Sequence, residues 1–148
     1  MKKLLISVVL SSMTTLSYAT QHAFLIQNSG WMEPFYQDQN SQFKPLINGV
    51  IQTVTKPDDK IVLSVFNQSN ALAKSPKMIY QGVANKNLLA DLQAQQIAYK
   101  SDKAYADTDF TEAVVSTITE PFAKQSGIIW IFTNNKNSPN NDVETIAR

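Results

Sequence analysis

The stretch Phe24-Leu25-Ile26-Gln27-Asn28-Ser29-Gly30-Trp31-Met32 decides the fold of this chain. Its first three residues are apolar, and the run stops abruptly in a polar turn that contains a glycine. An amphipathic segment follows from Ser41, with apolar residues at spacings of three and four. The pattern predicts a buried strand, a polar loop and then a helix. Open α/β sheets bind ligands in loops of this kind, at the carboxyl ends of their strands.

Three further segments have the character of strands. Residues 61–66 are a nearly continuous apolar run rich in β-branched side chains, which is typical of a strand buried on both faces. Residues 128–132 form the most apolar strand of the chain. A weaker strand is expected within residues 71–80. It carries lysines and a proline, so we place it at the edge of the sheet.

Helices are expected between these strands, at residues 41–54 and 85–96 and behind Asp109, which has capping-box spacing to Glu112. A further helix should begin at Asp142. The residues expected to face the sheet are Phe43, Leu46, Ile47, Val50, Ile51 and Val54 in the first helix, and Phe110, Ala113, Val114 and Ile118 behind Asp109. The alternation predicts one α/β domain with a doubly wound, mostly parallel sheet.

The first nineteen residues have the layout of a secretory signal peptide. Lys2 and Lys3 give a positive start, residues 4–10 form a short apolar core, and Ser17-Tyr18-Ala19 is a small-x-small cleavage site. The core is far shorter than the roughly 20 residues that a membrane-spanning helix needs. We expect export to the periplasm or the extracellular space, with residues 1–19 as the signal and 20–148 as the mature domain.

Composition argues against several classes of function. Loss of Lys2 and Lys3 leaves eleven basic and twelve acidic side chains, so the mature net charge of about −1 gives no basic surface for nucleic acid. The chain has no cysteine, its one histidine is His22 near the expected new terminus, and it has no Gly-x-Ser-x-Gly or glycine-rich phosphate motif. We expect no catalysis, no nucleic-acid partner and no transmembrane segment in the mature part.

Three polar loops should meet at one edge of a parallel sheet. They are Gln27-Asn28-Ser29-Gly30-Trp31, Asp107-Thr108-Asp109 and Thr133-Asn134-Asn135, and the second leads into the helix start Thr108-Asp109-Phe110-Thr111-Glu112-Ala113. Together they resemble the metal-ion-dependent adhesion site of von Willebrand factor type A (vWA) domains, whose motifs are Asp-x-Ser-x-Ser, Thr-Asp-x-x-x-Ala and Thr-Asp-Gly. The resemblance covers the whole mature chain.

The resemblance implies a Rossmann-like sheet of six strands, of which this chain reaches the fourth, so the C-terminal part of such a domain would be missing. It also implies a central first strand, with the second and third strands on one side and the fourth on the other. Residues 128–132 would then form an unpaired apolar edge. We expect residues 20–148 alone to be marginally stable and to self-associate.

By resemblance, five positions would surround a metal ion: Gln27, Ser29, Trp31, Thr108 and Asn134. None of them carries a charge. Hard divalent cations prefer oxygen ligands that include a carboxylate, so the site is degenerate and we expect no cofactor. Glu33, Asp107 or Asp109 could supply a carboxylate instead, which leaves weak magnesium or calcium binding open as an alternative.

The three loops therefore favour binding over catalysis. The expected contact residues are Asn28, Ser29, Gly30, Trp31, Phe35, Tyr36, Thr108 and Asn134, whose aromatic members, if exposed, would suit a protein or peptide partner. The leading hypothesis is an exported, non-catalytic, adhesion-type module. The alternatives are a metal-dependent adhesion domain with unusual ligands and an exported α/β enzyme whose catalytic residues lie beyond residue 148.

Overall fold

A four-stranded mixed sheet lies at the centre of the computed structural model, which describes residues 19–71 and 73–139. Its strands are β1 (Gln21–Gln27), β2 (Lys60–Phe66), β3 (Lys77–Gly82) and β4 (Ile128–Phe132), in the order β3-β2-β1-β4. β1 runs parallel to both β2 and β4, whereas β3 is antiparallel to β2. The predicted α/β class, the four strands and the mostly parallel sheet are confirmed.

The two central strands are the ones that the sequence makes most apolar. Every residue of β1 after Gln21 and every residue of β2 after Lys60 is buried. Strands covered on both faces need apolar side chains in both directions, which explains why neither run alternates with polar residues. β3 lies at an edge, as its lysine content predicted, with Lys77 and Met78 exposed.

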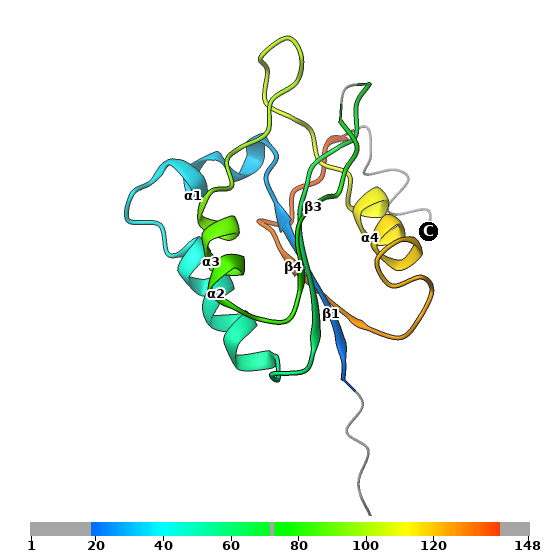
Figure 1. Cartoon of the computed structure of the whole chain (residues 1–148). Coiled ribbons are helices and arrows are strands. Elements are labelled where there is room, and N and C mark those ends of the chain that lie inside the picture. The colour runs from blue at the N-terminus through cyan, green and yellow to red at the C-terminus, as the bar shows by residue number, and fades with distance from the viewer. Residues whose placement is uncertain (1–18, 72, 140–148) are drawn as a thin grey trace, which may run out of the picture.

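Helices lie on both sides of the sheet. The short helices η1 (Gly30–Met32) and α1 (Glu33–Gln37) directly follow β1, and α2 (Phe43–Val54), α3 (Lys86–Gln93) and α4 (Phe110–Thr119) complete the described elements. Figure 1 shows α1, α2 and α3 on one side and α4 on the other. The helix predicted at residues 85–96 ends at Gln93, and the one expected from Asp142 lies outside the described residues.

Each face of the sheet carries its own apolar core. The larger core joins β1 and β2 to α2 and α3. Its buried members are Phe24, Ile26, Ile47, Ile51, Ile61, Leu63, Val65, Leu88 and Leu92. On the opposite face, Leu25 and Phe66 pack against Ala113 of α4, with Phe110 and Val114 beside them. The sheet therefore holds all three of the longer helices by burial of apolar surface.

Two residues predicted to face the sheet do not. Leu46 of α2 is 59% exposed, and Ile118 of α4 is 43% exposed. In α2 the buried positions are Ile47 and Ile51, one turn apart, and Leu46 is turned about 100° away from Ile47 around the helix axis. The apolar stripe of each helix is thus wider than the strip that the sheet covers.

Helix caps fix where α3 and α4 begin. The side chain of Asn85 accepts hydrogen bonds from the backbone N–H groups of Asn87 and Leu88 at the start of α3. Asp109 accepts from the N–H of Glu112 at 2.8 Å, which confirms the predicted cap of α4. The Glu112 carboxylate does not complete a capping box, because it accepts from the N–H of Ser69 instead.

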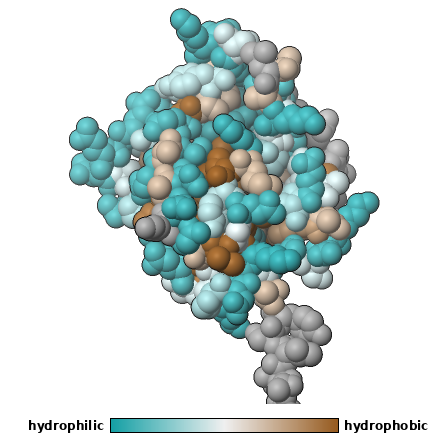
Figure 2. Space-filling model, viewed as in Figure 1, coloured by the Kyte–Doolittle hydropathy of each residue, from teal (hydrophilic) through white to brown (hydrophobic). Residues whose placement is uncertain are grey.

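The face of the molecule drawn in Figure 2 is mostly hydrophilic, and its hydrophobic residues form small separate patches. None of the helices in residues 19–71 and 73–139 has the length and apolar character needed to cross a bilayer. The edge strand β4 also exposes apolar side chains. Among the described residues it pairs only with β1, and Ile128 and Ile131 are 43% and 41% exposed.

We predict that Ile131→Lys lowers self-association, because a charge on an apolar edge strand blocks the addition of further strands. Light scattering over a concentration series measures the effect. The matched control is Val115→Lys on α4, which adds the same charge at a side chain that is 50% exposed. Equal association of the two variants would contradict a role for the β4 edge.

Candidate functional site

Three loops meet at the carboxyl ends of β1 and β4. The loop after β1 is tied to the loop before α4 by a hydrogen bond from Gly30 N to Ala106 O of 3.0 Å. The loop after β4 is tied to the same segment, because Thr108 and Ser138 bond twice, through Thr108 N to Ser138 Oγ at 2.9 Å and Ser138 N to Thr108 O at 3.3 Å. The predicted convergence of the three polar loops is confirmed.

The side-chain amide of Gln27 lies at the centre of these loops. Its Nε2 donates to Ser29 Oγ at 2.7 Å and to Thr108 Oγ1 at 2.9 Å, and it lies 3.2 Å from the carbonyl oxygen of Lys136. A carboxamide nitrogen has two hydrogens, so three oxygens share two donors. One neutral group therefore links one residue from each of the three loops.

The oxygen of the same amide is also used. Thr133 Oγ1 donates to Gln27 Oε1, and Thr108 Oγ1 donates to Ser29 Oγ at 2.5 Å. Gln27, Ser29 and Thr108 are completely buried. A buried polar group that loses its partner is destabilising, so this network fixes the relative position of the loops.

Gly30 allows the first two loops to approach closely. A Cβ atom at this position would lie 2.3 Å from Cβ of Tyr105, well inside van der Waals contact. Only glycine fits here without a shift of the backbone. Gly30 therefore has a structural role, and its predicted part in binding is indirect.

Trp31 lies at the surface of the site. Its side chain is 44% exposed, and the Lys136 ammonium lies 4.9 Å from the ring centroid as a cation–π contact. Its carbonyl oxygen accepts from Asn134 Nδ2 at 2.7 Å, and Asn134 Oδ1 accepts from the N–H of Lys136 at 3.1 Å. The amide of Asn134 therefore fixes the position of the exposed tryptophan.

The other two aromatic residues of the predicted rim differ from each other. Phe35 is 42% exposed and packs on Phe43, with ring centroids 5.8 Å apart. Tyr36 is half-buried, packs against the larger core and donates from its hydroxyl to Gln27 O at 3.2 Å. Burial raises the pKa of the Tyr36 hydroxyl. Trp31 and Phe35 are thus available to a partner, whereas Tyr36 supports the loop from inside.

Asn28 is buried, and its hydrogen bonds are all internal. Its side chain donates to Gln96 O at 3.2 Å and accepts from Asn67 Nδ2 at 3.0 Å. Its carbonyl accepts from the N–H of Ala98 at 2.8 Å. Like Ser29 and Thr108, Asn28 was predicted as a contact residue, but its side chain holds loops together beneath the surface.

The three carboxylates that could replace the missing metal ligands have other partners. Asp109 caps α4, and Asp107 forms an ion pair with Lys100, whose Nζ lies 2.5 Å from Oδ2. The Glu33 carboxylate accepts from the Tyr105 hydroxyl at 2.5 Å, and this bond raises the pKa of Tyr105 to about 12. Within the described residues, no group of three acidic, histidine or cysteine side chains could hold a metal ion.

Two members of the network were not identified from the sequence. Lys136 contributes a backbone carbonyl, which any residue type could supply, so its identity carries no signal for that role. Ser138 contributes a buried hydroxyl inside a polar segment rich in asparagine, where one more polar residue is unremarkable. Both lie in the loop after β4.

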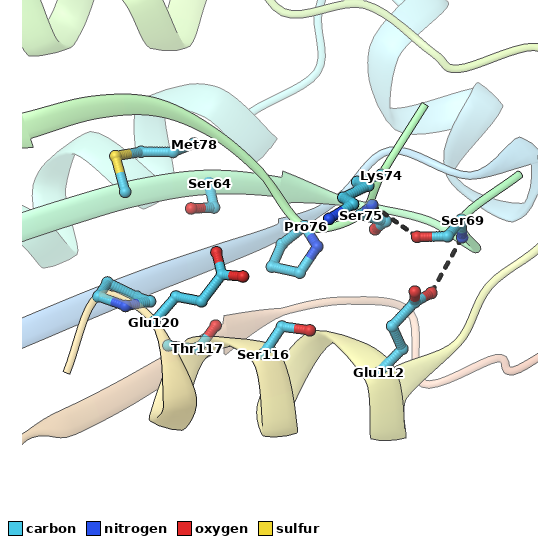
Figure 3. Close-up of a pocket in the computed structure, with 11 residues that line it drawn as sticks. Ser64, Ser69, Lys74, Ser75, Pro76, Met78, Glu112, Ser116, Thr117 and Glu120 are labelled. Carbon is cyan, nitrogen blue, oxygen red and sulfur yellow. Dashed lines mark hydrogen bonds between the residues drawn. The ribbon is translucent and has the colours of Figure 1, made fainter. Parts of the chain in front are cut away.

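A hollow that was not predicted from the sequence lies away from these loops. It has a volume of about 360 Å³ and lies between α4 and the β2–β3 side of the sheet (Figure 3). Glu112, Ser116 and Thr117 line it from α4, Glu120 from the residue after that helix, and Ser64 and Met78 from the strands. The one available signal was Ser64, a polar residue in the middle of the apolar run at residues 61–66.

Comparison with known proteins does not assign this site. No protein-family model matches the chain, and no curated protein matches it. The function must therefore be inferred from the chemistry of the three loops.

We predict that Gln27→Ala destabilises the fold by about 3 kcal/mol, because it removes a hydrogen-bond donor from two buried hydroxyls and opens a cavity. Chemical denaturation measures the loss. Gln52→Ala is the matched control, since Gln52 is exposed on α2 and makes one side-chain bond, to Asn48 at 3.1 Å. Its expected effect is below about 0.5 kcal/mol. Equal losses in both variants would show that the Gln27 network does not hold the loops.

Proposed function

We propose that this protein is an exported, non-catalytic binding module in which the Gln27 amide replaces the metal ion of a vWA-type adhesion site. The observation that carries the proposal is the placement of Nε2 within 3.2 Å of one oxygen from each of three loops. Its partner is a protein or peptide that binds without a metal ion.

The chemistry of the network supports this substitution. Magnesium needs oxygen ligands at about 2.0–2.1 Å in octahedral geometry. Here the oxygens of Ser29, Thr108 and Lys136 face an amide nitrogen, and an ion entering between them would have to displace Gln27 from a buried position. Among the described residues, the three nearby carboxylates already have partners: Asp109 caps α4, Asp107 pairs with Lys100 and Glu33 accepts from Tyr105. A neutral donor is the better match to these neutral oxygens.

The strand order gives independent support. The resemblance implied a central first strand with the second and third on one side and the fourth on the other, and the sheet has the order β3-β2-β1-β4. The three loops with vWA-like residues also meet in space. These two features support the alignment that places Gln27 and Asn134 at the positions of the family's aspartates.

The surface beside the network suits a partner. An open pocket of about 460 Å³ is lined by Gly30, Trp31, Glu33, Tyr105, Asp107 and Lys136. Trp31, which lines this pocket, and Phe35, in the helix that follows it, are both exposed, and aromatic residues are enriched at the energetic centres of protein interfaces. We define Trp31, Phe35 and Lys136 as the contact rim.

Millimolar magnesium, manganese or calcium should leave the thermal unfolding midpoint unchanged, whereas an ion at a hundred times its dissociation constant would add about 2.7 kcal/mol. The combined change Gln27→Asp, Trp31→Ser and Asn134→Asp should create ion-dependent stabilisation, because it restores two carboxylates and a hydroxyl. The matched control combines Gln27→Asn with Trp31→Ser, which alters the same loops without adding charge. A clear ion-dependent shift of the unchanged protein would favour the metal-dependent alternative.

A photo-reactive phenylalanine analogue in place of Phe35 should crosslink the exported protein to its partner, because this side chain lies at the contact rim. The yield, read as a mass shift, should persist in a metal chelator. The control places the same analogue at Val83, which is 47% exposed beside the opposite end of β2. Adducts at both positions, or loss of the adduct with the chelator, would contradict the proposed binding mode.

A further inference from the structure

A buried carboxylate lies at the opposite end of the sheet from the contact rim. Asp59, in the turn before β2, is only 3% exposed. It accepts backbone hydrogen bonds from Lys56 N at 2.7 Å and Thr20 N at 2.8 Å, and these bonds, led by the one from Lys56, hold the pKa of its carboxyl below the usual range. Asp59 is therefore a buried negative charge, a kind of group that normally has a cationic partner.

The side chain that contacts Asp59 is His22, and its hydrogen bonds show that it is uncharged. His22 Nε2 lies 3.4 Å from Asp59 Oδ2, and Trp130 Nε1 lies 3.0 Å from His22 Nδ1. An indole N–H can only donate, so His22 Nδ1 must accept, and the hydrogen-bond geometry assigns the imidazole proton to Nε2. The histidine thus donates toward Asp59 as a neutral ring.

No lysine or arginine among the described residues forms an ion pair with Asp59. Lys56 is exposed, and its side-chain charge acts only from a distance. The remaining neighbour is the backbone nitrogen of Thr20, the first residue of the expected mature chain. Thr20 is itself fixed, because its carbonyl accepts from the N–H of Lys60 at 2.9 Å.

We propose that Asp59 is the binding site for the chain's own new amino terminus, whose α-ammonium group on Thr20 becomes its counterion after processing. This inference rests on the proposed export. Hydrolysis of the Ala19–Thr20 bond consumes one water, leaves a carboxylate on Ala19 and releases an amine that takes up a proton. The backbone amide nitrogen of Thr20, which lies 2.8 Å from Asp59 Oδ1, thereby changes from a neutral donor to a charged ammonium donor.

The position of the cut decides whether the ion pair forms. Consecutive Cα atoms are about 3.8 Å apart, so a terminus one residue earlier or later would not place its amine at Asp59. Charge-assisted hydrogen bonds are roughly twice as strong as neutral ones. The mature protein is therefore more stable than any form that retains residues before Thr20.

The test compares a chain that begins at Thr20 with one that begins at Ser17 and so keeps an amide at Thr20. At pH 6 the Thr20 chain should unfold about 3–6 °C higher. An ammonium paired in the folded state has a raised pKa. The gain is thus complete below its unfolded value of about 8 and disappears as the pH rises through the folded value. Equal midpoints at pH 6, or a gain that persists at pH 11, would overturn the proposal.

Two controls separate this ion pair from other effects of chain length. Asp59→Asn should abolish the difference between the two chains at every pH. Nα-acetylation of Thr20 keeps both the length and Asp59 but restores an amide, so the acetylated chain should unfold like the Ser17 chain even if the asparagine variant does not fold. An acetylated chain as stable as the free one would overturn the ion pair.

The export on which the inference rests is tested separately by sequencing the first residue of the exported protein. Thr20 is expected. Another first residue would overturn the proposed processing whatever the unfolding midpoints are, whereas equal midpoints would overturn the ion pair and leave export intact.

Discussion

The arrangement of the loops above the sheet depends on the hydrogen bonds of a single neutral side chain. The Gln27 amide is buried at the end of β1 and joins Ser29, Thr108 and the Lys136 carbonyl, which come from three separate loops. If that amide is removed, the hydroxyls of Ser29 and Thr108 and the Lys136 carbonyl each lose one hydrogen-bond donor. The exposed Trp31 and the pocket beside it keep their places because the polar layer beneath them is satisfied.

A neutral network has functional consequences that a metal site does not share. A metal ion adds charge to a binding surface, whereas an amide only positions the residues around it. In the proposed binding mode, affinity then has to come from the contact rim, mainly through its exposed aromatic area. A buried charge lies at the other end of the sheet, at Asp59, where we propose that it binds the amino terminus of the processed chain.

The strands could be predicted from the sequence, because a short apolar run rich in β-branched residues, such as residues 61–66, is typical of a buried strand. It also located the three loops and the Asp109 cap. It could not show that Leu46 and Ile118 are exposed, since helical periodicity marks an apolar stripe but not how much of it the sheet covers. Nor could it show the contacts that define the candidate site, because they join residues up to 109 positions apart, and one of them uses a backbone atom.

The most direct test of this account is the hydrogen exchange of the Gln27 side-chain amide, followed by NMR. If Nε2 holds the three loops together, its two protons should exchange far more slowly than those of the exposed Gln52, and their shifts should not change with magnesium or a chelator. The account would be contradicted if the Gln27 protons exchange as fast as those of Gln52. It would equally be contradicted if magnesium moves their signals, because an ion would then share the position assigned to the amide.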